Sequence, residues 1–124
     1  MAINVLAVSV DGSDIIRLAE FWAEVLGQPV SPGATDGFAA IAIPDGLRLS
    51  FHHVPERKVV KNRVHLDLNI GGPRTDPPGD RRRRIDAEVG RLVQRGARQS
   101  RSVQELGGYF VNMFDPEGNE FDVH

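Results

Sequence analysis

The chain has 124 residues, of which 40% are hydrophobic and 26% are charged, and its formal net charge is −2 at pH 7. These values predict one globular domain, residues 1–124, that is long enough to bury a core. The chain has no cysteine, which excludes a disulfide framework, a thiolate zinc site and a cysteine nucleophile. A metal would therefore have to bind carboxylates or the imidazoles of the four histidines.

Charge and hydropathy also limit the partners and the location of the protein. A small negative net charge offers no electrostatic attraction for nucleic acid, and no apolar segment is long enough for a membrane helix. The N-terminal stretch is apolar but short and lacks a basic start, so we predict a cytoplasmic protein without membrane contact. The basic run 81–84 lies beside Asp80 and Asp86 at a predicted helix start. We interpret it as a solvated helix face rather than a contact for anions or nucleic acid.

The first half of the chain is predicted from its alternating and helical spacings of apolar residues. Asp11, Ser13 and Asp14 are candidates for the N-cap of the helix in this half, and Gly27 suits its end. The predicted elements are a strand at 3–10, a helix at 15–26, a loop at 28–37, and strands at 38–43 and 47–54.

The second half repeats this order. Its predicted elements are a strand at 63–70, a loop at 71–80, a helix at 81–95, and strands at 97–103, 109–114 and 119–124. Laying Gly46 on Gly118 aligns Ser50 with Asp122 and places His52 on His124. The repeat predicts an α+β fold of two paired βαβββ modules, residues 1–56 and 62–124, with curved sheets around a cleft and helices outside. The alternative is a ferredoxin-like sandwich with an extra hairpin.

Three of the predicted strands carry a polar face that includes a histidine. In strand 63–70, Val64, Leu66, Leu68 and Ile70 share one face and should pack on the helices. The polar faces carry His65, Asp67 and Asn69; Arg48, Ser50 and His52; and Glu120, Asp122 and His124. One such face usually meets solvent, but three favour a cleft, which we predict to be lined by His52, His65, Asp67 and Asp122.

Four segments in this order, "FWAEVLG", "KNRVHLDL", "RGA" and "DPEGNEF", resemble the glyoxalase-like domains of the vicinal oxygen chelate superfamily. The resemblance spans nearly the whole chain. It implies paired modules around a ligand cleft, a small-molecule ligand, and a homodimer, for which Tyr109, Phe110 and Met113 are the exposed apolar candidates.

The resemblance also implies a set of metal ligands, one from the first and one from the last strand of each module. His65 matches one position, and Asp122 falls where a glutamate is more usual. The first module has Val5 and Ala7 on its first strand and Ser50 on its last, although His52 could substitute. Because half the set is missing, no cofactor is firmly implied, and a divalent metal held by His65, Asp122 and His52 is expected at less than full occupancy.

His65 and Asp122 are also the candidates for catalysis, because an imidazole oriented by a carboxylate can move a proton α to a carbonyl or open a lactone-like ring. The structural alternative is a hydrogen bond that only satisfies two polar groups. The predicted function is binding of a small oxygenated metabolite, with lyase or isomerase activity left open. The alternative is a dimeric drug-sequestering protein similar to the bleomycin-resistance proteins. The predicted ligand-binding residues are His52, Asp67, Ser50, Asn69 and Tyr109.

Overall fold

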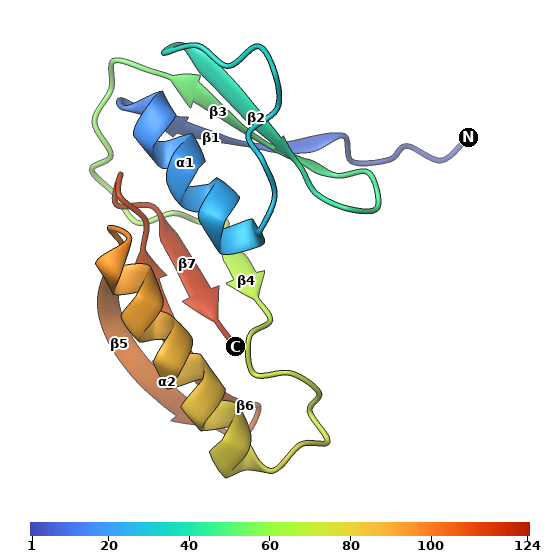
Figure 1. Ribbon diagram of the computed structural model, residues 1–124, viewed down its shortest axis with the longest axis vertical. Helices are drawn as coiled ribbons and strands as arrows, with labels where there is room; N and C mark the ends of the chain where they lie inside the picture. Colours follow the sequence, from blue (N-terminus) through green and yellow to red (C-terminus); the bar gives the residue numbers. More distant parts are fainter. The chain divides into compact units, whose positions relative to one another are not determined.

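The computed structural model describes all residues, 1–124, and divides into two compact units, Met1–Val59 and Val60–His124. Each unit contains one mixed sheet that packs against one helix (Figure 1). This arrangement confirms the predicted α+β class. Neither helix has the length together with the apolar character that crossing a membrane requires.

The first unit is built from β1 (Ala7–Gly12), α1 (Ile15–Leu26), β2 (Phe38–Ala42) and β3 (Arg48–His53). Strand β3 lies in the middle, parallel to β1 and antiparallel to β2. Helix α1 begins after Asp14, whose carboxylate accepts the N–H of Arg17, and ends at Gly27 in the left-handed conformation. The helix buries one stripe of apolar side chains: Ile15, Leu18, Ala19, Phe21 and Trp22.

The second unit is built from β4 (Leu66–Leu68), α2 (Pro78–Gln94), β5 (Arg98–Glu105), β6 (Gly108–Phe114) and β7 (Glu120–Val123). Its strand order is β4-β7-β6-β5, with β4 parallel to β7 and the other pairs antiparallel. Helix α2 packs on β5 and β6 and buries Ile85, Val89 and Leu92.

The registers of the two sheets support the predicted internal repeat. Ser50 on β3 is paired with Ser9 and Ala40, and Asp122 on β7 is paired with Asp67 and Asn112. Ser50 and Asp122 therefore occupy equivalent places in the two units, as the alignment predicts.

The strand that follows the helix is full length only in the second unit, where it is β5. In the first unit it is reduced to one bridge between Val30 and Ile41. Pro29 and Pro32 flank that bridge and have no N–H to donate to a longer ladder.

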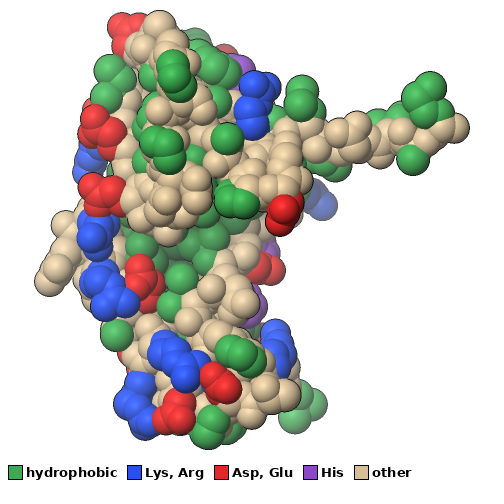
Figure 2. All heavy atoms as spheres, turned by 45° about the vertical axis from the view of Figure 1, so that its right-hand side comes forward, with side chains coloured by type: hydrophobic (Ala, Val, Ile, Leu, Met, Phe, Trp, Pro, Cys, Tyr) green, Lys and Arg blue, Asp and Glu red, His purple; other side chains and the backbone are tan.

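Two strands are shorter than predicted because their partners end. β1 begins at Ala7, opposite Arg48, rather than at residue 3. Residues 1–6 extend away from their sheet, with hydrophobic side chains exposed (Figures 1 and 2). β4 covers only Leu66–Leu68 because only three residues of β7 pair with it. Val64 is consequently 77% exposed, and the prediction that it packs on a helix is wrong.

Helix α2 begins at Pro78, three residues before the predicted start at residue 81. Proline is well suited to the first turn, because an N–H at that position would have no partner within the helix and the backbone angle of proline already suits a helix.

Met113 is predicted to be exposed, but its side chain is fully buried. It therefore cannot be part of a dimer surface.

Candidate functional site

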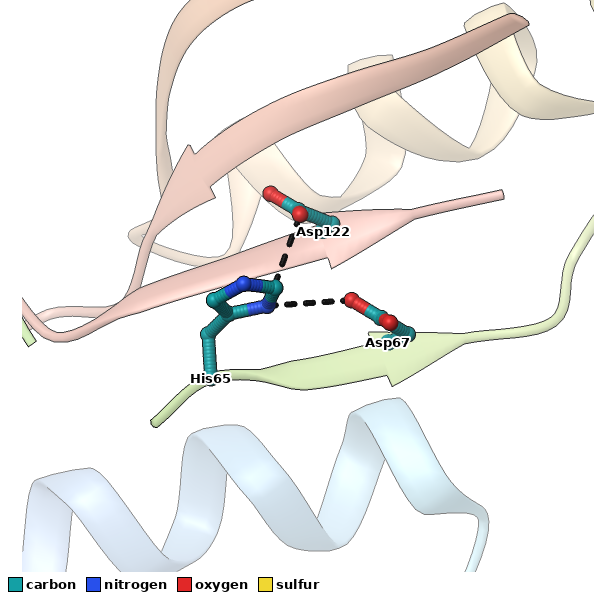
Figure 3. A group of neighbouring side chains, drawn as sticks. All are labelled: His65, Asp67 and Asp122. Atoms are coloured by element: carbon teal, nitrogen blue, oxygen red, sulfur yellow. Dashed lines mark hydrogen bonds and ion pairs between the residues drawn. The ribbon is translucent and has the colours of Figure 1, made fainter. Parts of the chain in front are cut away.

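Three predicted site residues meet at the parallel pairing of β4 and β7. Asp67 and Asp122 are register partners on these strands, and His65 lies just before β4. His65 Nδ1 is 3.0 Å from Asp67 Oδ1 and 3.5 Å from Asp122 Oδ2 (Figure 3). We call His65, Asp67 and Asp122 the His65 cluster. The predicted approach of His65 to Asp122 is present, and Asp67 joins it because a parallel register places the two carboxylates side by side.

The turn before β7 determines where Asp122 points. Asp115 is buried, and its Oδ1 accepts the backbone N–H groups of Glu117 and Asn119. Gly118 takes the positive φ of 85° that this turn needs. Phe121 and Val123 are then buried, and the alternation of the strand sends Asp122 to the opposite face.

Asn112 on β6 is a site residue that sequence reasoning missed. Its Nδ2 donates a 2.6 Å hydrogen bond to Asp122 Oδ1, which leaves Oδ2 directed at His65. Asp122 is only 8% exposed, so this bond also satisfies a largely buried carboxylate. The available signal was a lone amide within the apolar stretch "YFVNMF".

A second histidine borders the cluster. His124 stacks on Phe110, with ring centroids 4.9 Å apart, and its Nε2 lies 3.5 Å from Asp67 Oδ1. That nitrogen is buried and has no hydrogen-bond partner. The equivalent position of the first unit repeats the pair, since His52 contacts Phe38 with centroids 5.0 Å apart.

The remaining predicted ligand-binding residues are not part of the His65 cluster. His52 and Ser50 belong to the first unit, where Ser50 is buried with its Oγ 3.3 Å from Ser9 Oγ. Asn69 is exposed and follows β4 by one residue. Tyr109 lies on the face of the second sheet that α2 covers, because its hydroxyl donates to Asp86 and its ring lies beneath Arg82.

The hydroxyl of Tyr109 has a shifted pKa. Burial, and then the hydrogen bond to Asp86, raise the pKa of Tyr109 above its ordinary value of 10.0. A raised pKa means that this group stabilises the fold fully below about pH 10, and that the contribution is lost as the pH rises through the raised pKa.

We expect the phenol absorbance near 295 nm to titrate above pH 10, and Asp86→Asn to move the midpoint down towards the ordinary value. Tyr109 is the only tyrosine, so the signal belongs to one residue. Asp80→Asn on the same helix is the control and should leave the midpoint unchanged. An unchanged midpoint in Asp86→Asn would show that the hydrogen bond to Asp86 does not raise the pKa of Tyr109.

The His65 cluster has the donors that a divalent metal needs. One imidazole nitrogen and two carboxylate oxygens lie within 4.8 Å of one another. A mixed set of nitrogen and oxygen suits Mn(II), Fe(II) or Zn(II). The cluster therefore fits a metal in donor type, although Asp122 has one oxygen already bound to Asn112.

The two units share the order strand, helix, antiparallel strands, which is consistent with the vicinal oxygen chelate fold, and the second unit carries the His65 cluster. Residues 7–124 match the model of the glyoxalase-like domain, and the chain belongs to this family. No curated protein shows significant sequence similarity to the chain.

Solved structures agree on the fold at low identity. A glyoxalase/bleomycin resistance protein/dioxygenase family enzyme from Burkholderia phytofirmans is 16% identical, covers 98% of this chain and 97% of its own, and has a TM-score of 0.74. The possible glyoxalase from Bacillus cereus is 18% identical over 98% of both chains, with a TM-score of 0.71. A fosfomycin resistance protein from Listeria monocytogenes, solved with Mn(II) and a dihydroxypropylphosphonic acid, is 11% identical, covers 100% of this chain and 90% of its own, and has a TM-score of 0.73.

Proposed function

We propose that this glyoxalase-like protein binds a small oxygenated metabolite at the His65 cluster. We further propose that His65 acts as a general base towards the bound metabolite. The observation that carries the proposal is the position of His65 Nδ1, between Asp67 Oδ1 and Asp122 Oδ2. Isolated surface histidines have no such pair of oriented carboxylates, whereas acid–base catalysis requires one fixed ring orientation.

The proposed chemistry follows from the tautomer that this arrangement favours. With its proton on Nδ1, the ring donates a hydrogen bond to Asp67 Oδ1, and Asp122 lies close enough to hold the ring from the second side. In the neutral ring, Nε2 is then the free acceptor. A base at that atom can remove a proton from the carbon next to a carbonyl, or activate water for the opening of a lactone-like ring.

Asn112 acts as a positioning residue in this proposal. Its hydrogen bond to Asp122 Oδ1 prevents the carboxylate from turning away from His65. His124 and Phe110 form an aromatic wall beside Asp67, suited to the apolar part of a small ligand.

The test is deuterium exchange at the carbon next to the carbonyl, followed by ¹H NMR in D₂O. A panel of α-hydroxyketones and lactones is mixed with the protein, because exchange reveals proton removal even when no product accumulates. Loss of the α-proton signal, faster than without protein, is the expected result. Saturable binding without exchange across the panel would favour the alternative, a ligand-sequestering protein.

We expect purified, untagged protein to contain well under one equivalent of divalent transition metal. All three donors come from the second unit, and the equivalent first-unit positions hold Ser9 and Ser50 in place of Asp67 and Asp122. Elemental analysis measures the content. A stoichiometric metal that is lost in Asp122→Asn would contradict the expectation. A metal held by His65, Asp67 and Asp122 would polarise a substrate oxygen as a Lewis acid.

The homodimer implied by the family resemblance stays a prediction.

The family's small-ligand chemistry supports the choice of a small oxygenated metabolite, as the phosphonate in the Listeria protein illustrates.

A further inference from the structure

A cavity of about 510 Å³ lies at the N-terminal end of α2, within the second unit. It is bounded by the first turns of α2, by the loop before that helix, and by the hairpin that joins β5 to β6, residues 104–109. A volume of this size falls in the range of small-molecule sites. The cavity shares none of its lining residues with the His65 cluster.

Three arginines line this cavity: Arg74, Arg81 and Arg82. Arg74 donates a hydrogen bond to the carbonyl of Gly107, which fixes its guanidinium at the hairpin. Arg82 lies over the ring of Tyr109, 4.3 Å from the centroid. Two of the three cations are thus held in place by contacts that leave further N–H donors on each guanidinium.

Arg81 is the least satisfied of the three. Its Nε is buried and has no hydrogen-bond partner. The guanidinium packs against Gly71, where a Cβ would come within 3.0 Å of its Nη2. Because Gly71 has no side chain, the guanidinium of Arg81 has the space that it occupies. A buried donor without a partner costs folding free energy.

Acidic residues balance only part of this charge. Asp86 lies 3.8 Å from Arg82 Nε and offsets part of that charge. Asp76 and Glu105 also line the cavity, but Asp76 accepts a 2.7 Å hydrogen bond from Arg84, which neutralises it. Arg83, on the same helix, pairs with Asp80 and is not among the lining residues. Basic and acidic side chains lie next to one another on the surface of the second unit (Figure 2).

The run 81–84 is therefore not a uniform solvated face. Arg82, Arg83 and Arg84 are each paired with a carboxylate, as the sequence interpretation expects, but Arg81 and Arg82 also border a cavity. Pro78, Ile85 and Leu106 add apolar surface to the same lining.

We infer that this cavity binds a small organic anion, a phosphate or carboxylate with a short apolar part, at a site separate from the His65 cluster. Arg81, Arg74 and Arg82 bind the anionic group through charge-assisted hydrogen bonds, and the apolar lining contacts the remainder of the ligand.

The test is a titration of ¹⁵N-labelled full-length protein with inorganic phosphate, phenyl phosphate and benzoate at constant ionic strength. Saturable amide shifts are expected at Gly79, Gly107 and Gly108, which line the cavity. Phenyl phosphate should bind several-fold more tightly than inorganic phosphate, because only it reaches the apolar lining. The comparison of phenyl phosphate with benzoate tells whether a phosphate or a carboxylate is preferred.

Arg81→Gln and Arg74→Gln should each weaken phenyl phosphate binding about tenfold, which corresponds to about 1.4 kcal/mol. Arg83→Gln is the matched control and should change it less than about twofold, since Arg83 lies outside the lining. Arg81→Lys keeps the charge and serves if the Gln variant does not fold, as judged by its amide spectrum. It should bind more weakly than the native protein, because a lysine cannot form the paired hydrogen bonds of a guanidinium.

Two results would overturn the inference. One is the absence of saturable shifts at the three glycines with every anion. The other is an equal loss of affinity in Arg83→Gln and Arg81→Gln, which would indicate general charge attraction. His65→Ala should leave phenyl phosphate binding unchanged, so failure of the anion site and failure of the proposed function are told apart.

Discussion

His65→Ala is expected to lower the rate of α-deuterium exchange by about 10²- to 10⁴-fold, the range that a positioned general base contributes. The variant removes the imidazole but should keep the fold, because His65 lies on the exposed side just before β4. Ligand affinity should fall much less than the rate, since the proposed role is proton transfer rather than binding.

Two further variants separate chemistry from structure. Asp122→Asn keeps the size of the side chain and removes the carboxylate beside His65, so we expect a smaller but clear loss of rate. His53→Ala, an exposed histidine at the end of β3, is the matched control and should exchange at the native rate. Equal exchange rates in His65→Ala and the native protein would refute the assignment of His65 as the base.

Phe51→Ala is expected to lower the free energy of unfolding by about 3–5 kcal/mol, the usual cost of removing a fully buried aromatic ring. Phe51 lies in the central strand β3 and is 0% exposed. The loss combines the transfer free energy of the ring with the cavity that remains, because close-packed neighbours relax only in part.

Phe38→Ala is the matched control for this prediction. Phe38 is an aromatic residue of the same sheet, but it is 39% exposed, and its substitution should cost less than about 1.5 kcal/mol. Urea denaturation followed by the fluorescence of Trp22, the one tryptophan and a buried residue of α1, measures both variants. A similar cost for the two substitutions would show that the burial of Phe51 does not determine its contribution.

Local sequence was sufficient for the elements and for the direction of most side chains. Helix α1 follows from apolar spacing, from a cap that the sequence narrows to three candidates including Asp14, and from Gly27 as its end, all of which act within a few residues. The burial of Phe121 and Val123 follows from strand alternation, which depends only on the parity of neighbouring positions.

Local sequence could predict only some of the residues that form the His65 cluster. His65 and Asp122 could be paired from the polar faces and the family resemblance, and their approach is found at 3.5 Å. Asp67 and Asn112 join Asp122 because β4 and β6 flank β7 in particular registers. A register between strands far apart in sequence depends on which hydrogen-bonding edges meet, and no local pattern contains that information.

The lengths of β1 and β4 and the positions of the arginines also depended on tertiary contacts. Alternation continues through residues 3–6 and through Val64, but a strand ends where its partner ends. These residues therefore lie outside the paired strands and are exposed. Four consecutive arginines look equivalent in the sequence. They differ in the fold because a helix points successive side chains about 100° apart, towards a carboxylate in one case and towards the space beside Gly71 in another.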